Sequence, residues 1–478
     1  MIAVPTVRTI PFSPDLSRDS ICQAIAAASE RGRATIAAIP FEVTADIDLL
    51  DLFSANAATP GPKVFWHQQS RGLSFVGLDA VAASEAHGVG RFAAISEAVR
   101  GMLGLVVSDA ATRRDLRCLG GFAFDDNHRP ISTWRDFPGA AFWLPRWLVV
   151  ADRAGTRGVA CVTIEPDADA DRELSRLTAT LTDRLENARR SAQVPGQPVH
   201  AGPVCLDDVP GETAWKDAVG TAVEKIRVGP LRKVVLARST SFDAPIPFSV
   251  EPAIASLRAA NPSATVFAVT RGGSTFVGAT PELLVRLNER RFETVALAGT
   301  IARGTTPDDD LRLARQLLAS RKDRVEHEIV VETILDALRP VSRDVHRAEG
   351  TPRVERSKSV QHLSTPISGT LDGDRTVLDL VGRLHPTPAV GGAPSDPALA
   401  FIREHEHLDR GWYAGPVGWV DATGGGEFAV ALRSGVVTGA RATIFAGGGV
   451  VADSLPESEF AETAIKLRPM LDALGIDL

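Results

Sequence analysis

Strand–turn–strand patterns fill the second half of the chain and constrain its fold more than any other feature of the sequence. The predicted strands are 264–270 with 275–280, 282–287 with 291–297, and a meander of 415–420, 428–436 and 442–445. Short turns such as Arg271-Gly272-Gly273-Ser274 separate them, and short turns join antiparallel strands. Two predicted helices, 306–338 and 455–474, interrupt the strands. We therefore predict an α+β fold in which antiparallel sheets pack against helices.

A proline- and glycine-rich stretch divides the chain into two parts. Of the 478 residues, 44% are hydrophobic and 23% are charged, which is typical of soluble globular proteins. The run Val-Pro-Gly-Gln-Pro at 194–198 interrupts the pattern after a charged helix predicted at 172–192. We predict an N-terminal subdomain, 1–200, and a second domain, 211–478, which carries the motifs described below. The two parts are expected to pack as one unit.

The overall charge and the cysteines exclude several classes of protein. The formal net charge is −7, so the surface as a whole does not attract nucleic acid or an acidic membrane. No Cys-X-X-Cys pair occurs, which predicts reduced thiols rather than disulfides or a zinc site. The cysteines are Cys22, Cys118, Cys161 and Cys205. The sequence has no signal-peptide pattern and no membrane-spanning run, so we predict a cytoplasmic protein, a monomer or weak homodimer.

One lysine, Lys233, lies inside an otherwise apolar predicted strand, 231–238. Alternate residues of a strand share a face, so Lys233 lies beside Leu231, Val235 and Ala237. Burial would favour the neutral amine, which can take a proton from water. On this strand alone, an edge-strand lysine that prevents aggregation is the simpler interpretation. The polar residues further along the chain favour the chemical one.

Each of the two predicted helices carries a pair of carboxylates on one face. These are Asp323 and Glu326 in the first helix, and Glu459 and Glu462, beside Lys466, in the second. Taken alone, each pair is most simply interpreted as part of a helix face that is exposed to water. Mg²⁺, however, binds few protein carboxylates together with several waters and one anionic substrate group. Two oxygen-donor pairs on separate helices therefore suit a magnesium site.

Further polar residues lie at predicted turns and strand edges. Glu282 follows Gly-Ala-Thr-Pro between apolar strands; it is either a turn residue in water or a general acid with a raised pKa. Arg433 lies among small alanines, where its guanidinium could bind a carboxylate or have a structural role. The run Gly447-Gly448-Gly449 predicts either a tight turn or a loop that binds an anion. For His362 and His385, core and catalytic roles both stay open.

Several of these segments, in chain order, resemble the chorismate-utilising enzymes. They are 233–238, 278–282, 298–304, 322–327, 384–392, 411–418, and the glycine run with the helix that follows it. The resemblance extends from Ala214 to Leu474 and is looser over the first 200 residues. It implies an anthranilate synthase component I-like, chorismate-binding fold for the second domain.

Within this family, the residue at position 233 distinguishes the branches. The anthranilate type has glutamine there and uses ammonia, whereas lysine accompanies water as the nucleophile. Residues 384–388, Leu-His-Pro-Thr-Pro, resemble isochorismate synthases, and salicylate synthases differ there. The resemblance implies Mg²⁺-dependent conversion of chorismate to isochorismate, an isomerase activity. The alternatives are a salicylate synthase, which also eliminates pyruvate, and a non-catalytic chorismate-binding subunit.

The resemblance also implies a role for each candidate residue. Lys233 would deprotonate the water that attacks ring carbon C2, Glu282 would protonate the departing C4 hydroxyl, and His362 would orient the ring. Glu326 and Glu462 would bind Mg²⁺, supported by Asp323 and Glu459. The substrate carboxylates would contact Arg433, Tyr413, Lys466, Gly447, Gly448 and Gly449. Thr300 would also contact the substrate, although Ile301 and Ala302 follow it where many relatives have arginine and proline.

Overall fold

The computed structural model describes residues 12–43, 47–191, 205–356 and 360–476, so the stretch 194–198 and the boundary at residue 200 lie outside the described residues. The helices are α1 (Pro14–Arg31), α2 (Leu49–Ala55), α3 (Arg91–Gly104), α4 (Ala110–Asp115), α5 (Ala170–Ser191), α6 (Glu212–Val228), α7 (Val250–Ala260), α8 (Pro307–Ala319), α9 (Arg321–Leu338), α10 (Val377–Leu384), α11 (Ser395–His405) and α12 (Pro456–Leu474). Short 3₁₀ helices are η1 (Gln69–Arg71), η2 (Ser132–Trp134) and η3 (Arg339–Val341).

The strands are β1 (Thr35–Glu42), β2 (Lys63–Gln68), β3 (Leu73–Ala86), β4 (Val106–Val107), β5 (Arg117–Phe122), β6 (Ala140–Asp152), β7 (Gly155–Ile164), β8 (Cys205–Val209), β9 (Lys233–Asp243), β10 (Thr265–Arg271), β11 (Ser274–Thr280), β12 (Leu283–Asn288), β13 (Arg291–Ala302), β14 (His346–Arg347), β15 (Arg353–Arg356), β16 (Val360–Thr370), β17 (Gly392–Ala393), β18 (Pro416–Asp421), β19 (Gly426–Val430), β20 (Ser434–Thr438) and β21 (Arg441–Val450). Of the described pairings between these strands, only β1 with β4 is parallel. The predicted α+β fold with antiparallel sheets is therefore confirmed.

The strands form one hydrogen-bonded network that branches at β6. The start of β6 pairs with β5 and its end pairs with β7, while β3 pairs along its other edge. One branch continues from β3 through β2, β10, β11, β20 and β21 to β9. The other continues from β5 through β18, β19, β12 and β13 to β16. Strands from the two halves of the chain are thus hydrogen-bonded directly to one another.

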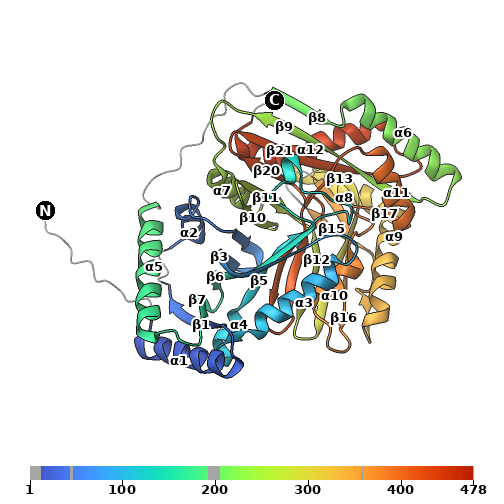
Figure 1. Ribbon diagram of the computed structural model, residues 1–478. Helices are drawn as coiled ribbons and strands as arrows, with labels where there is room; N and C mark the ends of the chain where they lie inside the picture. The colour runs from blue at the N-terminus through green and yellow to red at the C-terminus, as the bar shows by residue number, and fades with distance from the viewer. Residues whose placement is uncertain (1–11, 44–46, 192–204, 357–359, 477–478) are drawn as a thin grey trace.

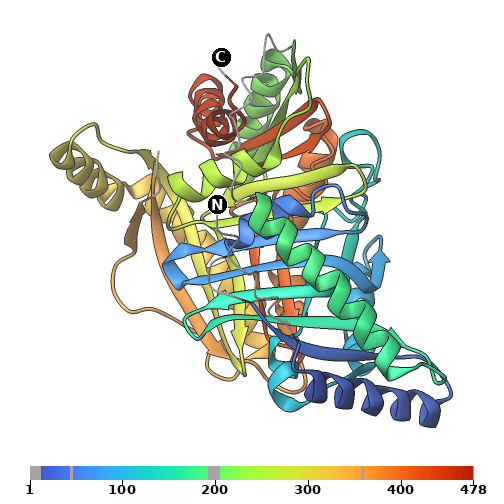
Figure 2. The same ribbon diagram turned by 90° about the vertical axis from the view of Figure 1, so that its left-hand side faces the viewer.

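Helices cover the outer faces of this network (Figure 1). One hydrophobic cluster joins the strands to the apolar faces of α1, α2, α5, α7 and α12. Figure 2 shows α1 and α5 lying across the strands of the N-terminal part. A second cluster includes the aromatic core between the branches and the buried faces of α3, α6, α9, α10 and α11. Among the described helices, none has the length and apolar character that crossing a bilayer requires.

The helix predicted at 306–338 is two helices, α8 and α9, so that prediction is wrong at its centre. Ser320 has an extended backbone between them, and its hydroxyl accepts a hydrogen bond from the backbone N–H of Asp323. A serine can end one helix and cap the next because its side chain satisfies a free N–H. The helix predicted at 455–474 is confirmed as α12.

Two predictions near the site are also wrong in detail. The strand predicted at 428–436 is divided into β19 and β20 by a turn, in which Arg433 adopts a φ of 50°. Few residues other than glycine adopt this left-handed conformation. The loop predicted at 447–449 is instead the end of β21, which pairs with 235–237 of β9.

Candidate active site

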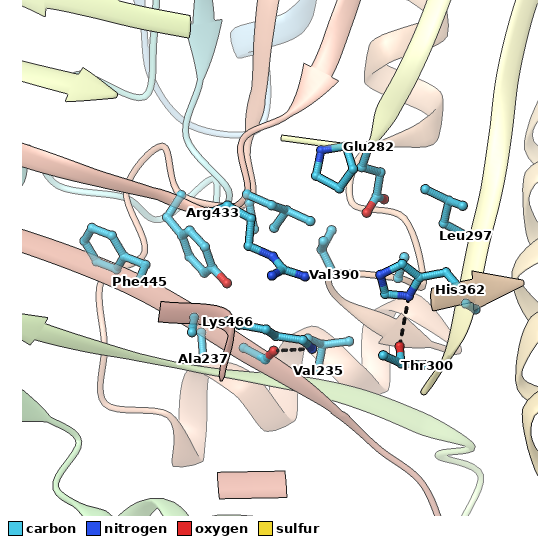
Figure 3. A pocket seen from close by; sticks show the side chains of 18 of the residues that line it. Val235, Ala237, Glu282, Leu297, Thr300, His362, Val390, Arg433, Phe445 and Lys466 are labelled. Carbon is cyan, nitrogen blue, oxygen red and sulfur yellow. Dashed lines mark hydrogen bonds between the residues drawn. The ribbon is translucent and has the colours of Figure 1, made fainter. Parts of the chain in front are cut away.

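A cavity lies where β9, β13, β16 and β21 approach α9 and α12. Nine of the fourteen residues predicted for the site line it: Lys233, Glu282, Thr300, Glu326, His362, Tyr413, Arg433, Gly447 and Lys466. In Figure 3 the Arg433 guanidinium, the Glu282 carboxylate and the His362 ring point into a common space. The remaining five, Asp323, Gly448, Gly449, Glu459 and Glu462, lie around this cavity rather than on its wall.

Lys233, at the start of β9, is paired with Glu326 on α9. Its Nζ lies 2.8 Å from Glu326 Oε1, and the Lys233 side chain is only 3% exposed. Burial opposes the charge on Glu326, but Lys233, Lys322 and Lys466 together lower its pKa. The sequence suggested an isolated amine among apolar side chains. The structure instead gives the amine a carboxylate partner.

Glu282 lies in the turn between β11 and β12 and is buried. Its backbone N–H donates to Thr280 Oγ1 at 3.2 Å, and its carbonyl accepts from the N–H of Val430 at 3.0 Å. Burial raises the pKa of Glu282 to about 7, although Lys233, Lys466 and Arg433 act in the opposite direction. A carboxyl with this pKa holds a proton for a large fraction of the time near neutral pH, as a general acid requires.

His362 and Thr300 face each other across β13 and β16. A bulge at Gly299, which has a φ of 74°, shifts the register of β13 and places Thr300 opposite His362. Thr300 Oγ1 lies 3.0 Å from His362 Nδ1, as the dashed line in Figure 3 shows. Burial, with help from Arg433 and Lys466, lowers the pKa of His362 to about 3. The imidazole is therefore neutral at physiological pH and can act as a hydrogen-bonding group.

Arg433 and Tyr413 supply polar groups on the wall beside β21. The turn between β19 and β20 turns Arg433 into the cavity, and burial lowers the pKa of its guanidinium. Tyr413 is 4% exposed, stacks on Phe445 with ring centroids 5.2 Å apart, and has a pKa raised to about 12 by burial. The phenol therefore keeps its proton and can donate a hydrogen bond.

The glycine run contributes through the edge of β21 that faces away from β9. In β9, the Ala237 N–H donates to Glu406 and the Val235 N–H to Gly391, so neither bonds to β21. Their partners Gly447 and Gly449 therefore turn their own N–H groups away from β9. Lys466 Nζ donates to the Gly447 carbonyl at 2.9 Å on that outer side. Backbone donors and an ammonium group thus meet at one edge of the cavity.

The four predicted metal ligands surround this region but form no tight cluster. In the described part of the chain, no three acidic, histidine or cysteine side chains are grouped closely enough to hold a metal ion. Glu326 is paired with Lys233, and Glu462 Oε1 lies 2.6 Å from Lys466 Nζ. Burial, and secondarily the charge of Glu462, raise the pKa of Glu459. Asp323 lies in the first turn of α9, against Gly299.

Sequence reasoning missed Arg410, which also lines the cavity. It directly precedes the segment 411–418, and a charged residue beside such a motif was an available signal. His385, for which two roles stayed open, lies in the core: its Nε2 contacts the Phe124 carbonyl at 2.9 Å, and its ring packs against Phe92 and Phe124. It is absent from the lining of the described cavity.

Comparison with known proteins agrees with the resemblance seen in the sequence motifs. The model of the family described as chorismate binding enzyme matches residues 23–475. The chain belongs to the chorismate binding enzyme family. The match extends through the N-terminal part, where the sequence motifs were loose, and the resemblance stated from the motifs is confirmed.

Two chorismate binding relatives and one solved structure are close over most of the chain. A salicylate biosynthesis isochorismate synthase of Pseudomonas aeruginosa is 38% identical over 474 residues, covering 98% of this chain and 96% of the relative. The isochorismate synthase MenF of Bacillus subtilis is 39% identical over 358 residues, 74% of each chain. The solved structure of MenF, the menaquinone-specific isochorismate synthase from Escherichia coli, is 25% identical, covers 95% of this chain and 100% of its own, and has a TM-score of 0.76.

Proposed function

We propose that this chain is an isochorismate synthase, which converts chorismate to isochorismate by adding water at C2 and releasing the C4 hydroxyl. The observation that carries this proposal is the presence of a buried amine, Lys233, and a buried protonatable carboxyl, Glu282, in one cavity of a chorismate binding enzyme. Relatives 38% and 39% identical carry this activity in their names.

Lys233 acts as the general base in this proposal. The deprotonated amine takes a proton from the water whose oxygen bonds to C2. The ammonium that forms lies 2.8 Å from Glu326. Glu326 therefore stabilises positive charge at the moment it develops on the base, which lowers the barrier.

Glu282 acts as the general acid. As the C2–O bond forms, the ring double bonds shift and the C4–O bond breaks, so the departing oxygen needs a proton. The raised pKa of Glu282, about 7, keeps that proton available near neutral pH. His362, held by Thr300, is neutral and orients the ring by hydrogen bonding.

The positive and N–H groups of the cavity suit the two substrate carboxylates. Arg433 can form two parallel hydrogen bonds to one carboxylate. Lys466, the Tyr413 hydroxyl and the outward N–H groups of Gly447 and Gly449 offer further donors. Gly448 lies between these two glycines, next to Glu459. These donors compensate for the negative charge of the protein as a whole.

Mg²⁺ fits the chemistry of the nearby acidic residues. Magnesium needs only one or two protein carboxylates, with water and substrate completing its shell, so a cluster of three is not required. The mutual repulsion of Glu459 and Glu462 also favours a cation beside them. We propose that Glu326 and Glu462 hold the ion, supported by Asp323 and Glu459. Bound Mg²⁺ would supply positive charge to the ring carboxylate.

The deciding experiment incubates the purified chain with chorismate and Mg²⁺ and identifies the product by chromatography and mass spectrometry. Isochorismate alone is expected. Salicylate and pyruvate would indicate the salicylate synthase instead, and no turnover by the single chain would indicate a non-catalytic subunit. EDTA should remove the activity and added Mg²⁺ should restore it; full turnover in EDTA would contradict the metal assignment.

The variant Lys233→Ala tests the role of the amine in the same assay. It should abolish water addition while leaving the thermal unfolding curve close to that of the wild type. A variant that unfolds would point to a structural role for Lys233. Three further predictions stay open. Limited proteolysis can test the boundary near residue 200, cell fractionation the cytoplasmic location, and light scattering the monomeric or weakly dimeric state.

A further inference from the structure

A buried ion pair takes the place of a neighbouring strand beside the part of β9 that lines the cavity. β17 pairs with β9 only at Lys233 and Val234. Beyond that point, the backbone groups of Val235 and Ala237 on the same edge need other partners, because buried backbone groups are nearly always hydrogen-bonded. Two side chains from the segment after α11, Glu406 and Arg410, bind two of these groups, the Ala237 N–H and the Val235 carbonyl.

The contacts of this pair connect β9, the segment at Val390 and the segment after α11. Glu406 Oε2 accepts from the Ala237 N–H at 2.8 Å. Arg410 donates to the carbonyls of Val235 at 2.7 Å and Val390 at 2.8 Å, and to both oxygens of Glu406. Both side chains are at most 2% exposed, and the guanidinium lies over the Phe124 ring, 4.1 Å from its centroid.

These contacts are more specific than stability alone requires. Replacing a buried ion pair by apolar side chains is often neutral for stability, so stability alone does not account for this pair. Here each contacted backbone group belongs to the wall of the cavity or to the strand that carries Lys233. Val235 lies two residues from Lys233, and Val390 lies in the neighbouring segment, whose Gly391 carbonyl accepts from the Val235 N–H at 2.9 Å.

We propose that Glu406 and Arg410 are a positioning pair for the reaction: they fix β9, and with it Lys233, relative to the wall at Val390. This inference rests on the proposed isochorismate synthase activity. Neither residue exchanges a proton with the substrate. Arg410 holds the Val235 and Val390 carbonyls of two adjacent wall segments in a fixed arrangement, and Glu406 holds both Arg410 and the β9 backbone.

The test compares the double variant Glu406→Leu/Arg410→Met with the wild type. The apolar pair fills similar volume without leaving an unpaired charge, but it cannot bind the groups of Val235, Ala237 and Val390. We expect kcat to fall by about 10- to 100-fold, since small misplacements of catalytic groups have effects of this size, while KM changes little. The control is Arg403→Met, which breaks the more exposed pair of Arg403 with Asp125 and should leave kcat unchanged.

A second variant separates positioning from folding. In Arg410→Ala, guanidinium ion at a few millimolar can enter the space left by the side chain, and we expect it to restore several-fold of the lost kcat. An unchanged kcat in the folded double variant would overturn the proposal. A loss of activity in Arg410→Ala that accompanies unfolding, and that guanidinium ion does not restore, would also overturn it. A wild type that does not convert chorismate would instead refute the proposed function itself.

Discussion

At the scale of single residues, the proposed general acid Glu282 is expected to make the activity depend on pH. Its pKa is raised to about 7, mainly by burial, and a general acid works only in its protonated form. The active fraction therefore falls as pH rises through about 7, by about tenfold for each further unit. We predict that kcat/KM, which reports the enzyme without substrate, shows a basic limb near pH 7.

The variant Glu282→Gln provides the check on this assignment. An amide cannot donate the proton, so activity should fall on the order of 10²- to 10⁴-fold, and the basic limb near pH 7 should disappear from the residual rate. Rates measured from pH 5.5 to 9 in constant ionic strength test both statements. A limb that persists in the variant would assign it to another group.

Gly449 controls the position of Lys233 through the absence of a side chain. A Cβ built at Gly449 would lie 3.1 Å from Lys233 Cε and 3.6 Å from Glu326 Oε1. We predict that Gly449→Ala displaces the amine by a few tenths of an ångström and lowers kcat by about tenfold. Gly101→Ala, in open space on α3, is the matched control and should have wild-type kcat. Equal rates for both variants would show that this contact is unimportant.

The sequence identified most polar side chains of the cavity individually but not their pairing. Lys233 stood out because a charge in an apolar strand violates the usual pattern, and Glu282 because it follows a turn between apolar strands. The ion pair of Lys233 with Glu326 joins residues 93 apart in the chain, and local periodicity carries no information about such contacts. Arg410 was missed although Glu406 lies four residues before it, because its backbone partners, Val235 on β9 and Val390 before β17, are distant in the chain.

At the scale of elements, Arg238 connects α12 to β9. Its Nε donates to Thr463 Oγ1 at 2.8 Å, its guanidinium lies 4.4 Å from the ring centroid of Phe460, and NH1 contacts Asp208. Arg238→Met should lower the free energy of unfolding by roughly 1.5–3 kcal/mol, because hydrogen bonds to a charged group are lost. It should also speed amide exchange in α12.

Arg468 offers the control on the same helix. Its ion pair with Asp472 is exposed, and exposed pairs contribute little, so Arg468→Met should leave urea unfolding and amide exchange in α12 unchanged. An equal change in the free energy of unfolding for Arg238→Met and Arg468→Met would mean that the contacts of Arg238 add nothing, and that α12 is held by its apolar face alone. The measurements are urea unfolding followed by tryptophan fluorescence and hydrogen exchange followed by mass spectrometry.

Elements were predicted well where periodicity was regular and poorly where one residue changed the backbone direction. The hairpin of β10 and β11 matches its turn sequence. The break at Ser320 and the turn at Arg433 each depend on a single residue. Arg433 is held in a left-handed conformation that its own preferences disfavour, so no local rule could have placed it there.

At the scale of the whole molecule, Glu427 joins the two halves of the chain. It is completely buried on β19, accepts from Arg286 Nε at 2.6 Å, and also accepts from Arg71 and Gln68 of the N-terminal half. Glu427→Gln removes the charge that both arginines bind and should lower the free energy of unfolding by roughly 1.5–3 kcal/mol. Because Glu427 lies outside the cavity lining, kcat of the folded variant should stay unchanged.

This variant also tests whether the N-terminal half folds separately. The two halves share one hydrogen-bonded network, because β2 pairs with β10 and β5 pairs with β18. Urea unfolding of Glu427→Gln should therefore remain a single transition, with its midpoint at a lower urea concentration. Arg18→Gln, which breaks an exposed pair with Asp171, should not move the midpoint. Two separated transitions would show that the halves are independently stable, and the shared strands would then be a docking surface rather than one cooperative core.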